Sequence, residues 1–328
     1  MKTITVSKTG GDYTSIQTAV NSIPRDNGEW VEIRIKPGEY HERLEVETPY
    51  IRFVGEDAMT TRITYNQGAS TVLPDGARSG TFRSYTVFFG THDLAAENIT
   101  FENAAGPGYI AGQSLALYAD GDRIAFRNCR FLGYQDTIFT GPLPPSSIIP
   151  NSFSGPRETS PRINGRQYYE NCFIRGDVDF IFGSATAYFQ GCEIFSKKRN
   201  DGRPGKSGGY ATAASTAEGQ RYGYIFHQCR FTSDNEAETV YLGRPWRNFA
   251  HTAVIRCQLG EHIHREGWHN WNKPDAEKTA RYEEYGNEGP GASLEHRPGW
   301  IRRLTAEQAA EYTVEKVLGG EDGWNPKS

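Results

Sequence analysis

The fold is decided by residues 171–194, NCFIRGDVDFIFGSATAYFQGCEI, which begin and end with two copies of one four-residue pattern. A small or polar residue stands first and an apolar residue fourth, and all five cysteines of the chain occupy the second position. The copies are Asn98-Ile99-Thr100-Phe101, Asn128-Cys129-Arg130-Phe131, Asn171-Cys172-Phe173-Ile174, Gly191-Cys192-Glu193-Ile194, Gln228-Cys229-Arg230-Phe231 and Arg256-Cys257-Gln258-Leu259. Their irregular spacing predicts similar strands joined by loops of different lengths, which is typical of a solenoid.

The segments between these copies contain short strand patterns and no helical period, so we expect an all-β fold. The predicted architecture is a single-stranded, right-handed parallel β-helix with short capping helices at its ends. The composition agrees, because 36 glycines, 12% aromatic residues and only two methionines suit a turn-rich β protein. In this fold the cysteines stack as small buried side chains along one inward column, and a disulfide within the column is the alternative.

The ends of the chain carry the helix signals. Residues 13–20 have apolar spacing for a short helix, and Thr305-Ala306-Glu307-Gln308 has the form of a capping box before residues 309–317. Residues 141–165 are rich in proline, serine, glycine and asparagine, which predicts one long loop inserted into a rung. We therefore expect a single domain over residues 1–328.

The charge balance limits the partners of this protein. The formal net charge of -4 provides no basic excess to neutralise phosphates, which argues against binding to nucleic acid or to a membrane surface. No segment is long and apolar enough to span a bilayer, and residues 1–6 alternate like a strand rather than forming the apolar core of a signal peptide. No cysteine pair has the C-x-x-C spacing of a zinc site, so no metal centre is expected.

Two aspartates hold matching positions in the repeat, because Asp136 follows Cys129 by the same number of residues as Asp179 follows Cys172. Equivalent positions on consecutive rungs lie side by side at the strand spacing of about 4.8 Å. Two carboxylates this close resist simultaneous ionisation, which separates their pKa values and provides an acid together with a base or nucleophile. Ordinary turn or surface aspartates are the alternative, which the matched register disfavours.

Two glutamines flank this pair when residues 113–117, 135–139 and 178–182 are aligned as three stacked strands. The side-chain amides of Gln113 and Gln135 can donate hydrogen bonds to a developing oxyanion. Strand alternation places Gln135 and Asp136 on opposite faces, so both serve one site only if the strand bends or bulges between them.

The chain resembles the pectin methylesterases over nearly its whole length. The matching segments, in the order of the family, are Pro37-Gly38-Glu39-Tyr40-His41-Glu42, Gln113 to Leu117, Gly133-Tyr134-Gln135-Asp136-Thr137, Asp177-Val178-Asp179-Phe180-Ile181-Phe182-Gly183 and Leu242-Gly243-Arg244-Pro245-Trp246. Further agreement comes from Gly267-Trp268 with Trp271, and from Tyr285-Gly286-Asn287 before Gly289-Pro290-Gly291-Ala292. The loop 141–165 is longer than in plant members of the family and closer to that of bacterial members. Because it lies between the two aspartate-bearing rungs, the subsite preference stays open.

The resemblance implies a role for each site residue. Asp179 is the expected nucleophile and Asp136 the general acid and base, while Gln113 and Gln135 are the oxyanion donors and Arg244 holds Asp179 ionised. The residues expected to bind the sugar are Trp246, Phe182, Thr81 and Tyr134.

The function implied by the resemblance is removal of methyl esters from the C6 carboxyl groups of galacturonate in pectin, with release of methanol. No cofactor is expected, and the expected partner is methyl-esterified homogalacturonan. A monomer is expected, with a secreted or periplasmic location inferred from the substrate. The alternatives are a pectin lyase that uses Ca²⁺, a retaining glycosidase, an esterase for another acyl group and a non-catalytic carbohydrate-binding solenoid.

Overall fold

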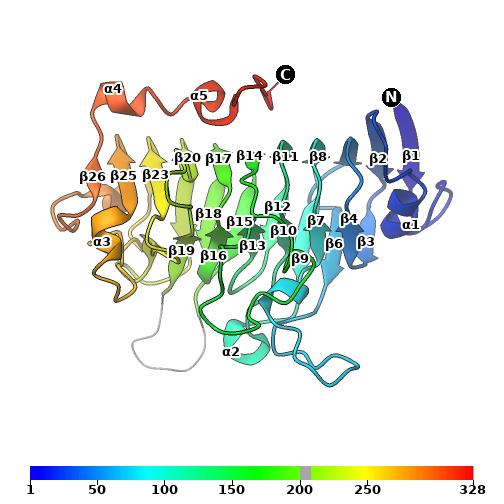
Figure 1. Cartoon of the computed structure of the whole chain (residues 1–328), viewed down its shortest axis with the longest axis horizontal. Coiled ribbons are helices and arrows are strands. Elements are labelled where there is room, and N and C mark those ends of the chain that lie inside the picture. The colour runs from blue at the N-terminus through cyan, green and yellow to red at the C-terminus, as the bar shows by residue number, and fades with distance from the viewer. Residues whose placement is uncertain (200–207, 328) are drawn as a thin grey trace.

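The computed structural model describes residues 1–199 and 208–327, which form a parallel β-helix (Figure 1). The chain winds through three parallel sheets, and successive rungs stack along the long axis of the molecule. The predicted fold class is therefore confirmed.

The three sheets contain eleven, eight and seven strands. The eleven-stranded sheet contains β1 (Lys2–Val6), β2 (Val31–Ile35), β5 (Ile51–Gly55), β8 (Leu94–Glu97), β11 (Ile124–Arg127), β14 (Arg166–Glu170), β17 (Thr186–Gln190), β20 (Tyr224–His227), β23 (His251–Ile255), β25 (Arg281–Tyr285) and β26 (Arg302–Arg303). The eight-stranded sheet contains β3 (Gly38–His41), β6 (Thr61–Tyr65), β9 (Thr100–Asn103), β12 (Arg130–Leu132), β15 (Phe173–Gly176), β18 (Glu193–Ser196), β21 (Arg230–Ser233) and β24 (Gln258–Leu259). The seven-stranded sheet contains β4 (Leu44–Val46), β7 (Val87–Phe89), β10 (Leu117–Ala119), β13 (Ile138–Thr140), β16 (Val178–Gly183), β19 (Tyr210–Ala214) and β22 (Tyr241–Gly243).

The helices are short and lie outside the sheets. They are α1 (Ile16–Asn21), α2 (Gly108–Ala111), α3 (Ala276–Thr279), α4 (Ala306–Ala309) and α5 (Val314–Leu318), with 3₁₀ turns η1 (Thr81–Arg83) and η2 (Pro290–Ala292). No described helix has the length and apolar character needed to cross a membrane.

The four-residue pattern forms the corner between the eleven-stranded and eight-stranded sheets. Its first residue adopts a left-handed backbone conformation, with φ of 51° at Asn128, 52° at Asn171 and 62° at Gly191. Asparagine and glycine tolerate this conformation best, which explains their recurrence at the first position. The cysteine that follows points inward, and all five cysteines are buried and free, so the disulfide alternative is wrong.

Stacked aromatic rings fill much of the core. Phe126, Tyr169, Phe189 and Phe226 lie on consecutive strands of the eleven-stranded sheet, with centroid separations of 4.9, 4.6 and 4.5 Å. These separations match the spacing of neighbouring strands, so each rung places its ring on the one before. Burial of each ring contributes about 1.5–3 kcal/mol to stability.

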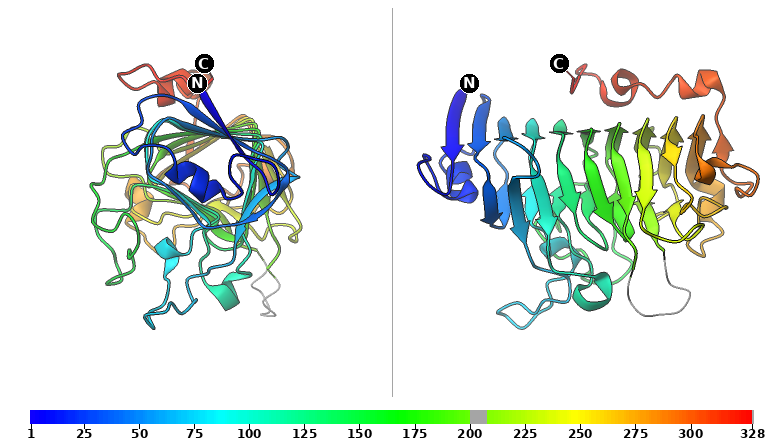
Figure 2. Two further views of the ribbon diagram at one scale, coloured as in Figure 1. Left: turned by 90° about the vertical axis from the view of Figure 1, so that its right-hand side faces the viewer. Right: turned by 180° about the vertical axis from the view of Figure 1, so that it is seen from behind.

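Helix α1 covers the N-terminal end of the core, as the capping prediction expected (Figure 2). Ser15 caps this helix by accepting a hydrogen bond from the backbone N–H of Thr18, and Glu42 accepts from the N–H groups of Ile16 and Gln17. These bonds satisfy donors at the first turn that have no partner within the helix.

The C-terminal helices follow a different course from the expected end cap. The capping box of Thr305 and Gln308 is present, but α4 ends at Ala309 and α5 is a separate helix. Both run along the side of the β-helix, back toward its N-terminal end (Figure 1). The reason is an apolar patch on the outer face of the eleven-stranded sheet, where Tyr188 and Ile225 pack with residues of α5.

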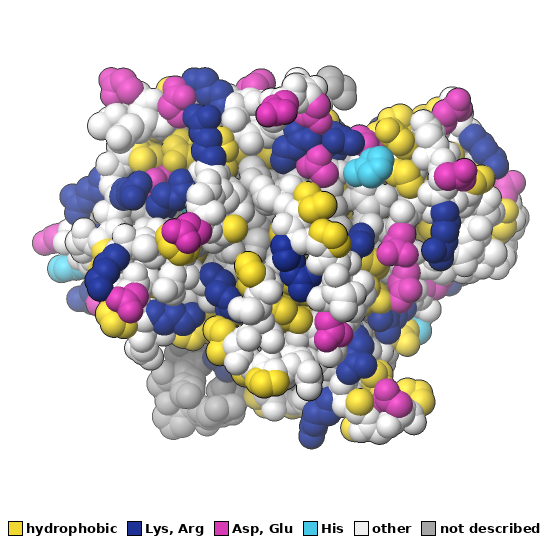
Figure 3. Space-filling view, in the orientation of Figure 1, with side chains coloured by type: hydrophobic (Ala, Val, Ile, Leu, Met, Phe, Trp, Pro, Cys, Tyr) yellow, Lys and Arg dark blue, Asp and Glu magenta, His cyan; other side chains and the backbone are white. Residues whose placement is uncertain are grey.

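Long connections leave the rungs on one side of the β-helix, below the strands in Figure 1. They comprise residues 66–86, residues 104–116 and the loop 141–165, which contains no helix or strand. On the face shown in Figure 3, acidic and basic side chains are interspersed rather than separated into large fields. The candidate site lies where these connections meet the seven-stranded sheet.

Candidate active site

Asp136 and Asp179 stand at equivalent positions of neighbouring rungs. Strands β13 and β16 pair Ile138 with Ile181, and the backbone N–H of Asp136 donates to the carbonyl oxygen of Val178 at 3.0 Å. The neighbouring placement expected from the cysteine spacing is therefore present. Both aspartates have a left-handed backbone, with φ of 63° and 49°. This conformation is unfavourable for residues with a Cβ, and such strain is concentrated at functional sites.

Arg244 holds the carboxylate of Asp179 through two parallel hydrogen bonds. Its Nε and Nη2 donate to Oδ1 and Oδ2 at 2.8 and 2.7 Å. Arg244 directly follows β22, and its guanidinium lies between the rings of Tyr210 and Trp271, at 3.8 and 3.7 Å from their centroids. Bidentate pairing and stacking on two sides fix the guanidinium and so fix the orientation of the Asp179 carboxylate.

The two carboxyl groups are buried and differ in their electrostatic surroundings. Asp136 is 8% exposed and Asp179 is 6% exposed. Burial raises the pKa of Asp136 well above its usual range, and the adjacent Asp179 raises it further. Burial also raises the pKa of Asp179, but its hydrogen bonds and charge interaction with Arg244 oppose that rise. Arg244 thus favours the ionised form at Asp179, while Asp136 has the stronger tendency to retain its proton.

A cleft of about 400 Å³ contains both aspartates and most of the residues predicted for the site. It is lined by Thr81, Gln113, Gln135, Asp136, Asp179, Phe182, Arg244 and Trp246, together with residues that the sequence did not single out. One wall comes from the loop 141–165, which contributes Ile148, Ile149 and Phe153. The cleft therefore joins a polar centre to an apolar wall.

The two glutamines lie beside each other, as the expected alignment placed them. The backbone N–H groups of Ser114 and Ala116 donate to the carbonyl oxygens of Gln135 and Thr137 at 3.1 and 2.8 Å, which is the bonding of parallel segments with Gln113 opposite Gln135. The alignment is wrong by one residue only from Leu117 onward, because Leu117 pairs with Ile138. Regular pairing of these strands starts only after the glutamines, because residues 113–116 and 135–137 lie outside β10 and β13. The left-handed turn at Asp136 supplies the bend needed for Gln135 and Asp136 to face one cleft.

Helix α2 restricts the side chain of Gln135. A Cβ placed on Gly108 would lie 2.6 Å from Oε1 and 2.9 Å from Cβ of Gln135. Only glycine at position 108 allows the helix to approach Gln135 this closely without moving it.

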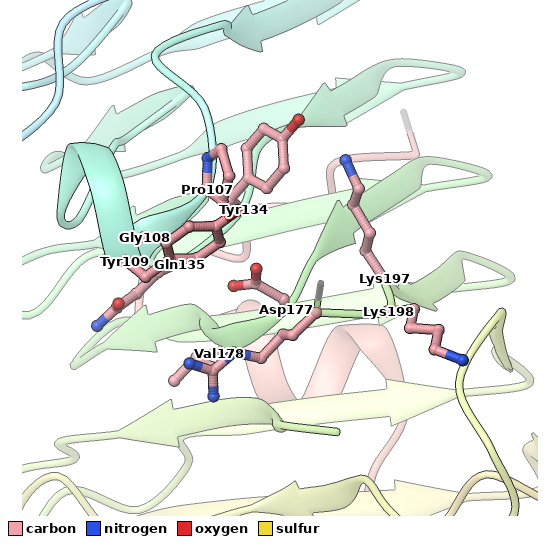
Figure 4. Close-up of a pocket in the computed structure, with 10 residues that line it drawn as sticks. Pro107, Gly108, Tyr109, Tyr134, Gln135, Asp177, Val178, Lys197 and Lys198 are labelled. Atoms are coloured by element: carbon pink, nitrogen blue, oxygen red, sulfur yellow. The ribbon is translucent and has the colours of Figure 1, made fainter. Parts of the chain in front are cut away.

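The expected sugar-binding residues divide between the cleft and its surroundings. Trp246 and Phe182 pack edge to face at 5.5 Å, and Phe182 is buried, so it mainly supports Trp246. Thr81, in η1, also lines the cleft. Tyr134 does not line the cleft but lines a neighbouring pocket of about 230 Å³ (Figure 4), because the turn at the aspartate directs it to the other side.

The residues that the sequence did not predict for the site include three that contact its catalytic end: Tyr210, Trp271 and Lys273. The first two clamp Arg244, and Lys273 donates from Nζ to the carbonyl oxygens of Pro245 and Trp246 at 3.0 and 3.2 Å. Burial and the nearby arginines lower the pKa of Lys273 to about 8. Trp271 belongs to a segment that matched the resemblance, but nothing in the repeat indicates that it contacts Arg244.

No cluster of three or more histidine, cysteine, aspartate or glutamate side chains suited to a metal ion occurs within residues 1–199 and 208–327. The polar groups of the cleft include a carboxylate pair, an arginine held against one carboxylate, two amides and the cations of Arg247 and Lys273.

The protein is thus a parallel β-helix that carries two buried, adjacent carboxyl groups in a cleft of about 400 Å³. A family model described as Pectinesterase matches residues 3–142 and 146–321. The chain belongs to the pectinesterase family.

Known relatives agree with this assignment. The chain is 35% identical over 317 residues to Pectinesterase 31 of Arabidopsis thaliana, covering 94% of this chain and 90% of that protein. It is 34% identical over 329 residues to Pectinesterase 5 of the same plant, covering 97% of this chain but only 50% of that longer protein. A crystal structure of a pectin methylesterase in complex with a hexasaccharide superposes with a TM-score of 0.82 at 30% identity, covering 99% of this chain and 98% of that one.

Proposed function

We propose that this enzyme hydrolyses methyl esters on the C6 carboxyl groups of galacturonate residues in pectin, producing methanol and de-esterified polymer. The observation that carries the proposal is the pair of buried carboxylates, of which one is ion-paired with Arg244 and the other is not. The names of the pectinesterase relatives, and a similar pectin methylesterase structure that holds a hexasaccharide, support the substrate class.

In the first step, a carboxylate oxygen of Asp179 attacks the ester carbonyl carbon. Arg244 favours the ionised form of Asp179 and orients its carboxylate. Burial raises the pKa of Asp179, so the carboxylate remains a better nucleophile than one of lower pKa. The carbonyl oxygen becomes an oxyanion, which accepts hydrogen bonds from the amides of Gln113 and Gln135. These donors line the same cleft as the nucleophile.

The tetrahedral intermediate then collapses with loss of methanol. The carbon–oxygen bond to the methoxy group breaks, and Asp136 donates its proton to the departing oxygen. Burial and the adjacent Asp179 raise the pKa of Asp136, which favours retention of that proton until methanol departs. The sugar carboxyl group is left joined to Asp179 as an anhydride.

Water completes the reaction. Asp136, now ionised, takes a proton from a water molecule whose oxygen attacks the anhydride carbon of the sugar. The bond to Asp179 breaks, which regenerates its carboxylate and the protonated Asp136. One ester and one water thereby give one carboxylic acid and one methanol, and the proposed steps require no metal or cofactor.

The walls of the cleft provide the contacts for the polymer. Trp246 offers an aromatic ring against which a sugar ring can pack, and Thr81 offers a hydroxyl in the same cleft. We infer that the chain acts as one domain and as a monomer on methyl-esterified homogalacturonan, outside the cytoplasm, and that nucleic acid is not a partner. The formal net charge of -4 supports the last point.

Product analysis on methyl-esterified pectin tests this proposal. We expect methanol release with an equivalent increase in free carboxyl groups, and no shortening of the polymer. Unsaturated ends would indicate a lyase, and new reducing ends would indicate a glycosidase. Binding without any product would indicate a carbohydrate-binding solenoid, and release of another acid would indicate an esterase for a different acyl group.

A further inference from the structure

Lys273 lines the catalytic cleft, but none of the steps proposed above uses it. Its ammonium group donates hydrogen bonds to the carbonyl oxygens of Pro245 and Trp246 at 3.0 and 3.2 Å. It also lies 4.5 Å from the ring centroid of Trp271, which attracts a cation through its π face. These partners are uncharged. A half-buried cation held by uncharged groups is costly, and such groups are concentrated at functional sites.

The turn that leads to Lys273 has an unfavourable backbone conformation. Trp271 and Asn272 have φ of 56° and 54°. Consecutive left-handed residues with a Cβ are uncommon and persist where their surroundings fix them. Side chains fix them here, because the N–H of Trp271 donates to Nδ1 of His269 at 2.9 Å and the N–H of Asn272 donates to Oδ1 of Asn270 at 2.8 Å. The turn thereby brings Trp271 and Lys273 together to the cleft.

The segment that Lys273 contacts carries two groups of the site. Residues 244–246 follow β22 and supply the guanidinium that binds the nucleophile and the indole ring proposed to pack against the sugar. Two N–H groups of this segment donate to β19, to the carbonyl oxygens of Thr212 and Ala214 at 3.0 Å each. Two of its carbonyl groups accept from Lys273, and one of these also accepts from Arg247 at 3.0 Å. The sheet therefore holds the donors of the segment, and Lys273 holds its acceptors.

Lys273 also adds a positive charge to the end of the cleft that contains the nucleophile. Burial raises the pKa of Asp179, and the charges of Arg244 and Lys273 oppose that rise. Burial and the charges of Arg247 and Arg244 lower the pKa of Lys273 to about 8, while the charge of Asp179 opposes that change. The charge of Lys273 is therefore present below about pH 8 and is lost above it.

We propose that Lys273 is a positioning residue of the site, which holds Trp246 for the sugar through two backbone carbonyl groups and supplements the charge of Arg244 at Asp179. This inference rests on the proposed esterase function and adds a residue that supports its catalytic groups. Lys273 acts through Trp246 and Asp179. Its loss therefore weakens substrate binding and shifts the ionisation of the nucleophile without removing a step of the reaction.

The test is the pH dependence of methanol release from methyl-esterified pectin by Lys273→Met, which keeps an unbranched side chain but removes the charge and the donors. Near neutral pH we expect KM to rise by about tenfold, because two charge-assisted hydrogen bonds are lost. The value of kcat should stay within about twofold of the wild type, since the interaction is made equally in the ground state and the transition state. The acid limb of kcat/KM should move to higher pH by up to about 1 unit, which is less than in Arg244→Gln.

Lys273→Arg provides a second readout that does not depend on the stability of Lys273→Met. Arginine stays charged throughout the accessible pH range and can donate to two carbonyl groups. Its KM should stay level above about pH 8, where the KM of the wild type should rise as Lys273 loses its charge. Its acid limb should coincide with that of the wild type.

Lys278→Gln is the matched control, because Lys278 lies in the adjacent helix α3 but is exposed and pairs with Asp275. It should leave KM and the acid limb unchanged. If KM and the acid limb of Lys273→Met matched those of the wild type, or if the KM of the wild type and of Lys273→Arg varied alike above about pH 8, the positioning role would be overturned while the esterase function stood. Absence of methanol release by the wild type would instead overturn the esterase function itself.

Discussion

Replacement of Arg244 by glutamine tests how the site divides labour between its two carboxyl groups. The change removes two charge-assisted hydrogen bonds of 2.8 and 2.7 Å to Asp179 and the only charge paired directly with it among the described residues. An adjacent cation typically lowers the pKa of a carboxyl group by about 1–3 units. Without Arg244, only the charge of Lys273 opposes the effect of burial on Asp179, so the pKa of Asp179 rises further.

The assay is the pH dependence of kcat/KM for methanol release. The wild-type profile should be bell-shaped, with an acid limb from ionisation of the carboxyl pair assigned mainly to Asp179 and an alkaline limb assigned mainly to Asp136. In Arg244→Gln the acid limb should move to higher pH by about 1–3 units, so the pH range over which the enzyme is active becomes narrower. At a pH below the acid limb of the variant, each unit by which the limb moves lowers kcat/KM by about tenfold.

Arg247→Gln is the control for general loss of charge from the cleft. Arg247 lines the same cleft and its guanidinium lies 4.8 Å from the ring centroid of Trp246, but it donates hydrogen bonds to the carbonyl oxygens of Trp246 and Ser146. This variant should keep the acid limb of the wild type. If the profile of Arg244→Gln superimposed on that of the wild type apart from its height, Arg244 would not tune the nucleophile.

Three further outcomes are expected. Gln113→Ala or Gln135→Ala should lower kcat by a factor on the order of 10² to 10³ with a smaller change in KM, and a raised KM with unchanged kcat would make the glutamines sugar-positioning groups instead. Asp136→Asn should raise the melting temperature increasingly as pH rises. Because the pKa of Asp136 is raised in the folded state, its contribution to stability is complete below the unfolded-state pKa and is lost as pH rises toward the folded-state pKa. The loss is up to about 1.4 kcal/mol per pH unit. If the difference in melting temperature between the variant and the wild type were the same at acid and alkaline pH, burial would not be the cause of the raised pKa. Exhaustive chelation should leave methanol release unchanged, whereas activity restored by Ca²⁺ would favour the lyase reading.

The repeat made the rungs and the carboxylate pair predictable from sequence. Cysteines at one position of the pattern set the register, and Ile138 pairs with Ile181 as that register requires. The first residue of the same pattern forms a left-handed corner, as at Asn128. The asparagines and glycine at this position indicate the corner, because these residues tolerate a left-handed backbone, whereas strand alternation alone does not reveal it.

The rest of the site depends on connections that no repeat constrains. The alignment was wrong by one residue at Leu117 because the N–H groups of Ala116 and Leu117 both donate to the carbonyl oxygen of Thr137, an irregularity that strand alternation does not reveal. Tyr210 and Trp271 come from distant parts of the chain to clamp Arg244, and only the folded arrangement shows them on either side of one guanidinium. The C-terminal helices follow the apolar outer face of a sheet, a feature of the folded surface.

The most direct test of the account is methanol release from methyl-esterified pectin by Asp179→Asn and Asp136→Asn, each compared with the wild type after circular dichroism has verified a β-rich fold. Asparagine keeps the shape of each side chain but can neither attack as a carboxylate nor exchange the proton. We expect kcat to fall by at least about 10³-fold in both variants, because each substitution removes a group essential to the chemical step. A folded variant of either kind that released methanol at a near-normal rate would contradict the two-aspartate mechanism.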